Sequence, residues 1–172
     1  MTSATLEDVK TALTEQHARV KDLIEAVRGA EPAERQGAFT TLCALLAAHE
    51  AAEEECIHAI AKADLTGDEA AIVDERTAEE DEAGSAIAAL EQMDASSAQF
   101  TSAFEDLASS VVAHAEAEEH VELPKLDGKA DEEQFTRMLD ALGLVPEMAS
   151  RATGGSFKER LEAARAEFRS EV

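Results

Sequence analysis

The sequence predicts an all-α protein, an up-down-up-down antiparallel four-helix bundle with a C-terminal helical extension. Ala, Glu and Leu dominate the 172 residues, and the chain contains no Trp and no Tyr. Apolar residues recur at helical spacing through four long stretches that are separated by short turns. Because short connections between long helices favour antiparallel neighbours, these stretches are expected to form one bundle with a sizeable core.

The four bundle helices are bounded by turns rich in Gly, Pro, Asp and Ser, residues that end one helix or cap the next. These turns are Gly29–Pro32, Leu65–Asp68, Asp94–Ser97 and Leu123–Gly128. The helices between them are expected to span residues 5–28, 35–63, 68–93 and 97–121. We therefore predict that residues 1–126 form the bundle domain.

Residues 127–172 are expected to form a helical tail that packs on the bundle. A short helix is predicted near 131–143, before Pro146, and a flexible loop at 151–155. A last amphipathic helix near 156–169 carries basic residues that contrast with the acidic body. Its apolar residues are Phe157, Leu161, Ala164 and Phe168, and its basic residues are Lys158, Arg160, Arg165 and Arg169. This helix either packs on the bundle and offsets charge or forms a dimer contact, so a monomer and a homodimer both remain open.

The chain is strongly acidic, with 38 Asp and Glu against 15 Lys and Arg and a formal net charge of −23. Such a surface repels phosphate backbones and anionic lipids, which excludes nucleic acid and membrane surfaces as partners. No stretch approaches the roughly 20 apolar residues that a membrane-spanning helix needs.

The two cysteines, Cys43 and Cys56, fall in one expected helix. Thirteen residues of helix separate them by about 20 Å, whereas a disulfide needs Cα atoms within about 7 Å. We therefore expect two buried, unpaired thiols. The first residues, MTSATLEDVK, lack a basic region followed by an apolar run, so no secretory signal is expected and the predicted location is the cytoplasm.

The apolar seam of each bundle helix is interrupted near its middle by His or Glu. Buried carboxylates are rare unless they are paired or bind metal, so four such interruptions indicate a shared polar site. Counted from turn centres near residues 32, 65 and 96, the interruptions fall within about two helical turns of one level. The sequence therefore predicts one polar cluster, formed by His17, His49, Glu53, Glu80, His114 and Glu118.

Four members of this cluster form two HxxxE motifs, His49–Glu53 and His114–Glu118. Residues i and i+4 lie on one helix face, so each motif directs one imidazole and one carboxylate to the same point. A carboxylate can bridge two metal ions, and imidazoles with carboxylates suit iron, manganese or zinc rather than calcium or magnesium. The alternative interpretation is a buried polar network, or surface His–Glu pairs, without metal.

The segments that carry these residues resemble the hemerythrin-like HHE cation-binding family. EQHARVKDLIEAV, around His17, is similar to the first element of the family pattern. HEAAEEECIHAI is similar to the second element and HAEAEEHVELPKL to the fourth, and the resemblance covers roughly residues 5–126. It implies a four-helix bundle that binds two non-haem iron ions through the His and Glu residues of these motifs.

The third helix departs from the family pattern, which has a Glu-His pair followed by regularly spaced apolar residues. The apolar residues here are Ala83, Ile87 and Leu90. Counting back from them places Glu80 at the ligand position, with Asp81 about 100° off the seam. A carboxylate therefore replaces the expected imidazole, and the implied site has three His and three Glu. Whether Asp81 approaches the metals stays open.

Extra anionic ligands stabilise the higher oxidation state of iron, so we expect an oxidised, oxo- or hydroxo-bridged di-iron centre, with manganese as the alternative metal. Such a centre suits chemistry with peroxide, superoxide or nitric oxide, as in a stress-defence oxidoreductase of the peroxidase or catalase kind. The alternative is reversible binding or sensing of oxygen or nitric oxide without turnover. In either case the ligand is a small diatomic molecule or a peroxide. A third hypothesis is a structural bundle that holds no metal.

The directions of three residues beyond the motifs depend on how far the regular helices continue. His58 lies five residues after Glu53 and about 180° from His49 by helix phase, so an uninterrupted helix turns it away. If the helix ends nearby, His58 can swing in as an extra ligand or as a hydrogen-bond partner of a ligand. Val121 is expected to continue the inward seam of the fourth helix, and His120 is expected on the surface.

Overall fold

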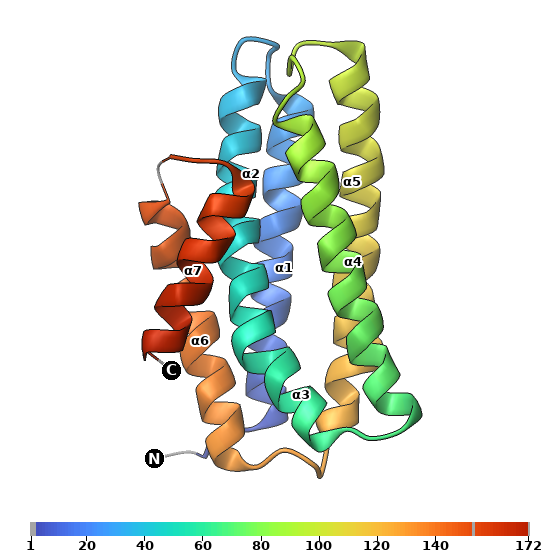
Figure 1. Ribbon diagram of the computed structural model, residues 1–172, viewed down its shortest axis with the longest axis vertical. Helices are drawn as coiled ribbons and strands as arrows, with labels where there is room; N and C mark the ends of the chain where they lie inside the picture. Colours follow the sequence, from blue (N-terminus) through green and yellow to red (C-terminus); the bar gives the residue numbers. More distant parts are fainter. Residues whose placement is uncertain (1–2, 153, 172) are drawn as a thin grey trace.

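The computed structural model describes residues 3–152 and 154–171, and all regular structure in these residues is helical. The elements are α1 (Leu6–Gly29), α2 (Arg35–Ala52), the π turn η1 (Glu53–Ile57), α3 (His58–Asp64), α4 (Asp68–Leu90), α5 (Ala98–Ala117), the π turn η2 (Glu118–Glu122), the 3-10 turn η3 (Leu123–Leu126), α6 (Glu132–Arg151) and α7 (Phe157–Glu171). Helices α1, α2, α4 and α5 run along the long axis, and α6 and α7 lie to one side (Figure 1). The predicted all-α class is confirmed for the described residues.

Local sequence signals set where the long helices begin. At α1, Thr5 and Asp8 form a reciprocal capping box, in which the Thr5 N–H donates to Asp8 Oδ2 at 2.9 Å. At α5, Ser97 Oγ accepts a hydrogen bond from the Phe100 N–H at 3.0 Å. Side chains thereby satisfy backbone N–H groups that have no partner inside the helix.

Two of the predicted helices, 35–63 and 97–121, are not regular throughout. Each changes to a π turn at the glutamate of its HxxxE motif: the His58 N–H donates to the Glu53 carbonyl, and the Leu123 N–H donates to the Glu118 carbonyl. A π turn contains one residue more per hydrogen-bonded ring than an α-helix, so it rotates everything that follows.

The rotation at η2 makes one expectation for the fourth helix wrong. Val121, expected inside, is 44% exposed, and Glu122 is buried in its place. The ideal helical phase holds only up to Glu118, and the extra residue of the π turn moves the seam by one position.

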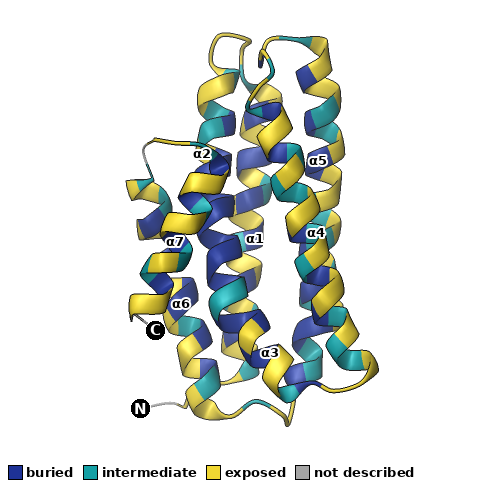
Figure 2. Ribbon diagram, viewed as in Figure 1, coloured by how far each residue is buried: buried dark blue, intermediate teal, exposed yellow. Residues whose placement is uncertain are grey.

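The core is divided into two apolar clusters that lie above and below the level of His17. One cluster is anchored by Phe39, Phe100 and Phe104, whose rings contact edge to face or stack with centroids 5.2 to 6.1 Å apart. The other contains Leu13 and residues from α3, η3 and α6. Figure 2 shows the buried residues facing the inside of the helix assembly. Both cysteines are buried and unpaired, as expected.

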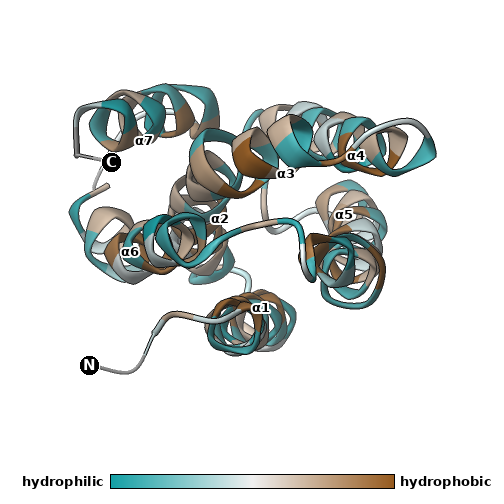
Figure 3. Cartoon of the chain, turned by 90° about the horizontal axis from the view of Figure 1, so that it is seen from below, coloured by the Kyte–Doolittle hydropathy of each residue, from teal (hydrophilic) through white to brown (hydrophobic). Residues whose placement is uncertain are grey.

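Helix α2 is covered on more than one side, so it is apolar nearly all round. Every residue from Leu42 to Ala52 is buried. Seen along the axis, α2 lies between α1, α6 and α7 (Figure 3). The basic residues of α7 reach the acidic turn after α2: Arg165 Nη2 lies 2.5 Å from Glu54 Oε1. Helix α7 therefore contributes both apolar contacts and ion pairs to this face of the molecule.

Helix α6 is longer than predicted, because it continues through Pro146 to Arg151 instead of ending near residue 143. Proline lacks the N–H that would bond to the carbonyl four residues earlier, that of Leu142. The Gln16 side chain on α1 donates to this carbonyl at 2.7 Å and replaces the missing bond. Of the predicted loop at 151–155, Arg151 is helical and Thr153 lies outside the described residues.

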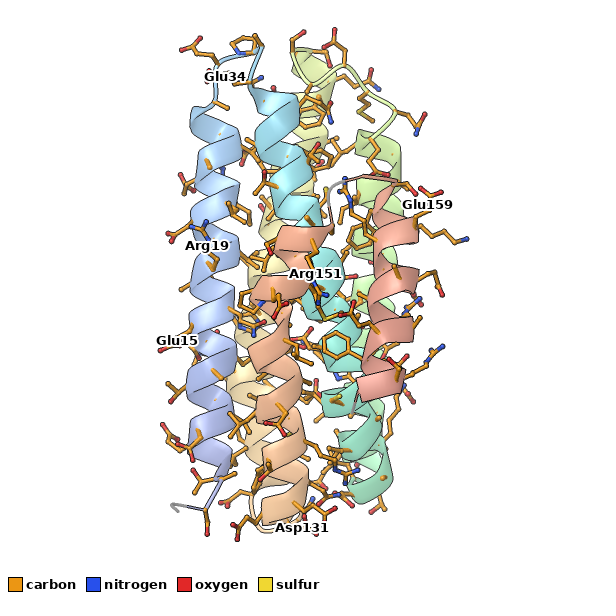
Figure 4. All side chains as sticks on the ribbon, turned by 90° about the vertical axis from the view of Figure 1, so that its left-hand side faces the viewer. Glu15, Arg19, Glu34, Asp131, Arg151 and Glu159 are labelled. Atoms are coloured by element: carbon orange, nitrogen blue, oxygen red, sulfur yellow. The ribbon has the colours of Figure 1, made fainter. Side chains whose placement is uncertain are left out.

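The outer faces of the helices carry the charged residues. Figure 4 shows Glu15 and Arg19 projecting from α1, and Arg151 near the end of α6, where its Nη2 lies 2.6 Å from Glu167 Oε1. None of the helices in the described part of the chain has the length and apolarity that a membrane crossing requires.

Candidate metal centre

Six polar side chains meet between the two apolar clusters. They are His17 from α1, His49 and Glu53 from the first HxxxE motif, Glu80 from α4, and His114 and Glu118 from the second motif. All are buried except His114, which is partly exposed. Nε2 of His49 lies 3.1 Å from Glu53 Oε1, and Nε2 of His17 lies 3.2 Å from Glu118 Oε2. The structure therefore brings together every residue of the predicted cluster.

The six residues form two groups that share two carboxylates. One group is His17, His49, Glu53 and Glu118, and the other is Glu53, Glu80, His114 and Glu118; in each, the ligand atoms lie within 4.8 Å of one another. Glu53 and Glu118 belong to both groups and start the two π turns. A carboxylate has two oxygens, so each of these two residues can offer one oxygen to either group.

A fourth histidine, His58, joins the cluster. Its Nε2 lies 2.6 Å from Glu80 Oε1 and 3.8 Å from Glu118 Oε1, and its ring is buried. The sequence alone would allow His58 to turn inward if the helix ended nearby. The helical chain does not end before His58, so a helix end is not the reason that His58 faces the cluster. The π turn η1 has one residue more in its hydrogen-bonded ring than an α-helical turn. This extra residue changes the direction of the His58 side chain, so its imidazole points into the cluster. Asp81, by contrast, is exposed and lies outside these groups.

Each of the four histidines has its Nδ1 atom held by an oxygen of a neighbouring side chain. The pairs are His17 with Glu119 at 2.7 Å, His49 with Gln16 at 2.9 Å, His58 with Glu122 at 2.8 Å and His114 with Glu79 at 2.9 Å. Carboxylate oxygens and the Gln16 amide oxygen accept hydrogen bonds, so each Nδ1 carries the proton and each Nε2 is free to face the cluster. In proteins, imidazoles that bind metal ions are oriented in the same way, by a hydrogen bond from the ring nitrogen that does not bind the metal.

Sequence reasoning missed these four acceptors because none lies on an apolar seam. A signal was nevertheless present: Gln16, Glu79 and Glu119 each sit directly beside a seam residue, where the side chain can reach the next helix. Glu122 also sits beside an expected seam residue, Val121, but it is the π turn that brings it inside.

The inner atoms of the cluster lack hydrogen-bond partners. Among the described residues, these buried atoms include Nε2 of His17 and of His114, both oxygens of Glu53, and one oxygen each of Glu80 and Glu118. Buried polar atoms are rarely left without a partner. A nitrogen lone pair that faces a carboxylate oxygen at close to 3 Å needs a positive charge between them, either a proton or a metal ion. The donor set therefore fits a cation.

The same surroundings shift the pKa values in opposite directions. Burial lowers the pKa of His17 and His114, but the carboxylate of Glu118, 3.2 and 3.3 Å from their Nε2 atoms, outweighs it and raises each pKa to about 10. Burial and the nearby charge of His17 lower the pKa of His49 to about 3. Burial and the charge of Glu118 raise the pKa of Glu53 to about 8. A metal ion at this site therefore competes with bound protons.

Comparison with known proteins agrees with this chemistry. The family described as "Hemerythrin HHE cation binding domain" matches residues 8–126 of the chain. Comparison with curated proteins and with solved structures gave no match. The matched range contains all four histidines of the cluster and all their Nδ1 partners.

Proposed function

This chain belongs to the hemerythrin HHE cation-binding family, and we propose that it holds a pair of non-haem iron ions. His17 and His49 would bind one ion, and His58, His114 and Glu80 the other. Glu53 and Glu118 would bridge the two. In this assignment His58 supplies the imidazole that the third helix lacks. We also propose the up-down-up-down antiparallel topology typical of this family for the segments within residues 1–126.

The observation that carries this proposal is the orientation of the four imidazoles. Four Nδ1 atoms are each held at 2.7 to 2.9 Å by a side-chain oxygen, which directs four Nε2 atoms to one buried point. A polar network without metal would instead pair the Nε2 atoms with donors, and among the described residues two of the four lack such a partner. The proposal of a metal-free structural bundle is therefore less well supported.

We infer that the centre acts on peroxide, superoxide or nitric oxide. Bound iron would supply Lewis acidity and redox cycling. The chain supplies three carboxylate ligands, and three of the four imidazoles donate to carboxylates, which raises their basicity as ligands. Both features favour the oxidised metal. Apolar clusters lie on either side of the ligands along the helices.

Reversible binding of oxygen or nitric oxide remains the second candidate, and one observation favours it. His58 raises the number of nitrogen ligands from the three expected from the sequence to four. Neutral nitrogen ligands help a ferrous ion to resist oxidation by oxygen. A fourth imidazole, that of His58, therefore favours the function of a carrier or a sensor.

Elemental analysis with an absorption spectrum of the purified protein tests the metal assignment. We expect about two iron ions per chain and a ferric absorption band, and Glu118→Ala should lose most of the iron. The matched control is Glu116→Ala, which alters an exposed glutamate on the same helix. A folded protein that takes up neither iron nor manganese would contradict the proposal, and manganese without iron would correct the metal.

Exposure of the ferrous protein to oxygen and to hydrogen peroxide separates the two functions. Repeated consumption of peroxide with a supplied reductant supports turnover. A spectral change that reverses when oxygen is removed, without consumption, supports the carrier or sensor.

A further inference from the structure

A cavity of about 620 Å³ adjoins the metal cluster and reaches His49, Glu80 and His114. It is bounded by α1 and α2 on one side and by α4 and α5 on the other (Figure 1). A water molecule takes up about 30 Å³ of liquid volume, and a diatomic gas or hydrogen peroxide is of the same order. Pockets for organic ligands span roughly 300–1,000 Å³. The cavity is therefore much larger than the small ligand of the metal centre requires.

The wall of the cavity away from the metal cluster is apolar. Leu46 and Leu107 contribute to it, and alanines on α4 and α5 form much of the rest. These are Ala83, Ala86, Ala89, Ala103, Ala113 and Ala115. Protein interiors are normally close-packed, so short side chains at these positions leave space that longer ones would fill.

One polar side chain in this wall has no partner. Glu50 is 5% exposed and lines the cavity, and its carboxyl group makes no hydrogen bond or ion pair to any described residue. It lies one residue from His49, about 100° off the seam, so sequence reasoning gave it no role. A ligand that fills the cavity displaces water from this carboxyl group, so a hydroxyl group on the ligand is needed to supply a hydrogen bond in its place.

The charges around the cavity select against anions. Glu82 and Asp106 are exposed lining residues, Glu79 is partly exposed, and Lys21 is the one Lys or Arg among the described lining residues. The chain as a whole carries −23. An anionic ligand would be repelled on approach and would meet Glu50 inside.

We propose that this cavity binds an uncharged, mainly apolar organic molecule beside the metal centre, with a hydroxyl or hydroperoxyl group directed to Glu50. The part of the proposal that makes this molecule a substrate rests on the proposed di-iron function. Binding itself depends only on the cavity.

The test uses 1-octanol as the probe and octanoate as its anionic counterpart. Titration calorimetry is carried out on the whole chain in its metal-free and iron-loaded forms. Octanol should bind to both forms. In the metal-free form octanoate should bind at least about tenfold more weakly, because its carboxylate meets the acidic rim of the cavity and Glu50 inside it. Octanol should also perturb the absorption spectrum of the iron-loaded protein, since the cavity adjoins His49 and His114.

Variants identify the site. Ala86→Phe on α4 and Ala103→Phe on α5 fill the cavity from opposite walls, and each should weaken octanol binding by about tenfold or more, which is 1.4 kcal/mol per factor of ten. Ala88→Phe, on the exposed face of α4, is the matched control and should leave binding unchanged. Glu50→Ala should weaken octanol binding by about tenfold through loss of the hydrogen bond.

Three results would overturn the proposal: no octanol binding to either form, equal binding of octanoate to the metal-free form, or unchanged binding in both cavity-filling variants. Failure of the metal assignment would leave octanol binding to the metal-free protein in place. Failure of octanol binding would leave the iron content as expected.

Discussion

Replacing His58 with Leu tests the role of the first π turn most directly. In the metal-free protein His58 lies between two buried carboxylates, with Nε2 at 2.6 Å from Glu80 and Nδ1 at 2.8 Å from Glu122. Burial lowers the pKa of His58, but the hydrogen bonds to Glu122 and Glu80 outweigh this and raise it well above 6.5. The imidazole is therefore charged at pH 7, and Leu removes the cation that both carboxylates face.

The expected loss follows from the burial of the pair. Removing one partner of a buried ion pair costs about 3–5 kcal/mol. For a domain of this size each kcal/mol lowers the melting temperature by about 2–4 °C, so His58→Leu should lower it by roughly 6–20 °C. Because the pKa of folded His58 is raised, its contribution is fully present below the unfolded value and is lost as the pH rises through the folded value. The difference in melting temperature between His58→Leu and the unsubstituted protein should therefore become smaller in alkaline buffer.

Thermal unfolding of the metal-free protein, followed by far-ultraviolet circular dichroism, measures this effect. His120→Ala is the control, because His120 is exposed and a surface change stays within about 0.5 kcal/mol. Adding Glu80→Gln to His58→Leu should recover part of the loss, since it removes one of the two unpaired charges. A melting temperature for His58→Leu equal to that of His120→Ala would refute the assignment of His58 as the buried cation.

Three other predictions concern metal uptake and the tail. In the metal-free protein the pKa of His17 is about 10 and that of Glu53 is about 8, so both groups hold protons at pH 7. Binding of Mn²⁺ at pH 7 should therefore release protons, and the affinity for Mn²⁺ should increase as the pH rises. Calorimetry in buffers of different ionisation enthalpy measures the number of protons released. Gln16→Leu should weaken Mn²⁺ binding about 10–100-fold with the fold retained; unchanged affinity would contradict its orienting role. Arg165→Ala should lower the free energy of unfolding in urea by at most about 1 kcal/mol, and Arg19→Ala, an exposed control, by less.

The contrast between Glu53 and His58 shows which side-chain directions helical periodicity predicts and which it does not. Glu53 directly follows the regular helix α2, in which each residue turns by a constant angle, so its spacing from His49 indicates its direction. His58 follows the π turn, and the same rule applied to it gives the opposite face. Within η2, Glu122 is buried and Val121 is exposed, the reverse of the regular helical phase, for the same reason.

The tail shows a second limit. In an isolated helix, Pro146 would favour a helix end, because proline has no N–H to donate to the preceding turn. Helix α6 continues because Gln16, distant in sequence, donates to the Leu142 carbonyl that the proline leaves without a partner. The same Gln16 side chain accepts the Nδ1 proton of His49, so one residue connects the tail to the metal cluster.

The sequence by itself determined the helical class, the turns and the six residues that meet at one level, because composition, capping and helical periodicity are local properties. Only the tertiary structure decided the π turns, the entry of His58 and Glu122, and the four Nδ1 partners. These depend on which groups from other helices are near enough to satisfy a buried donor or acceptor. A π turn gives up regular helix geometry and is favoured here because it brings His58 between Glu80 and Glu122, an arrangement that no spacing within one helix encodes.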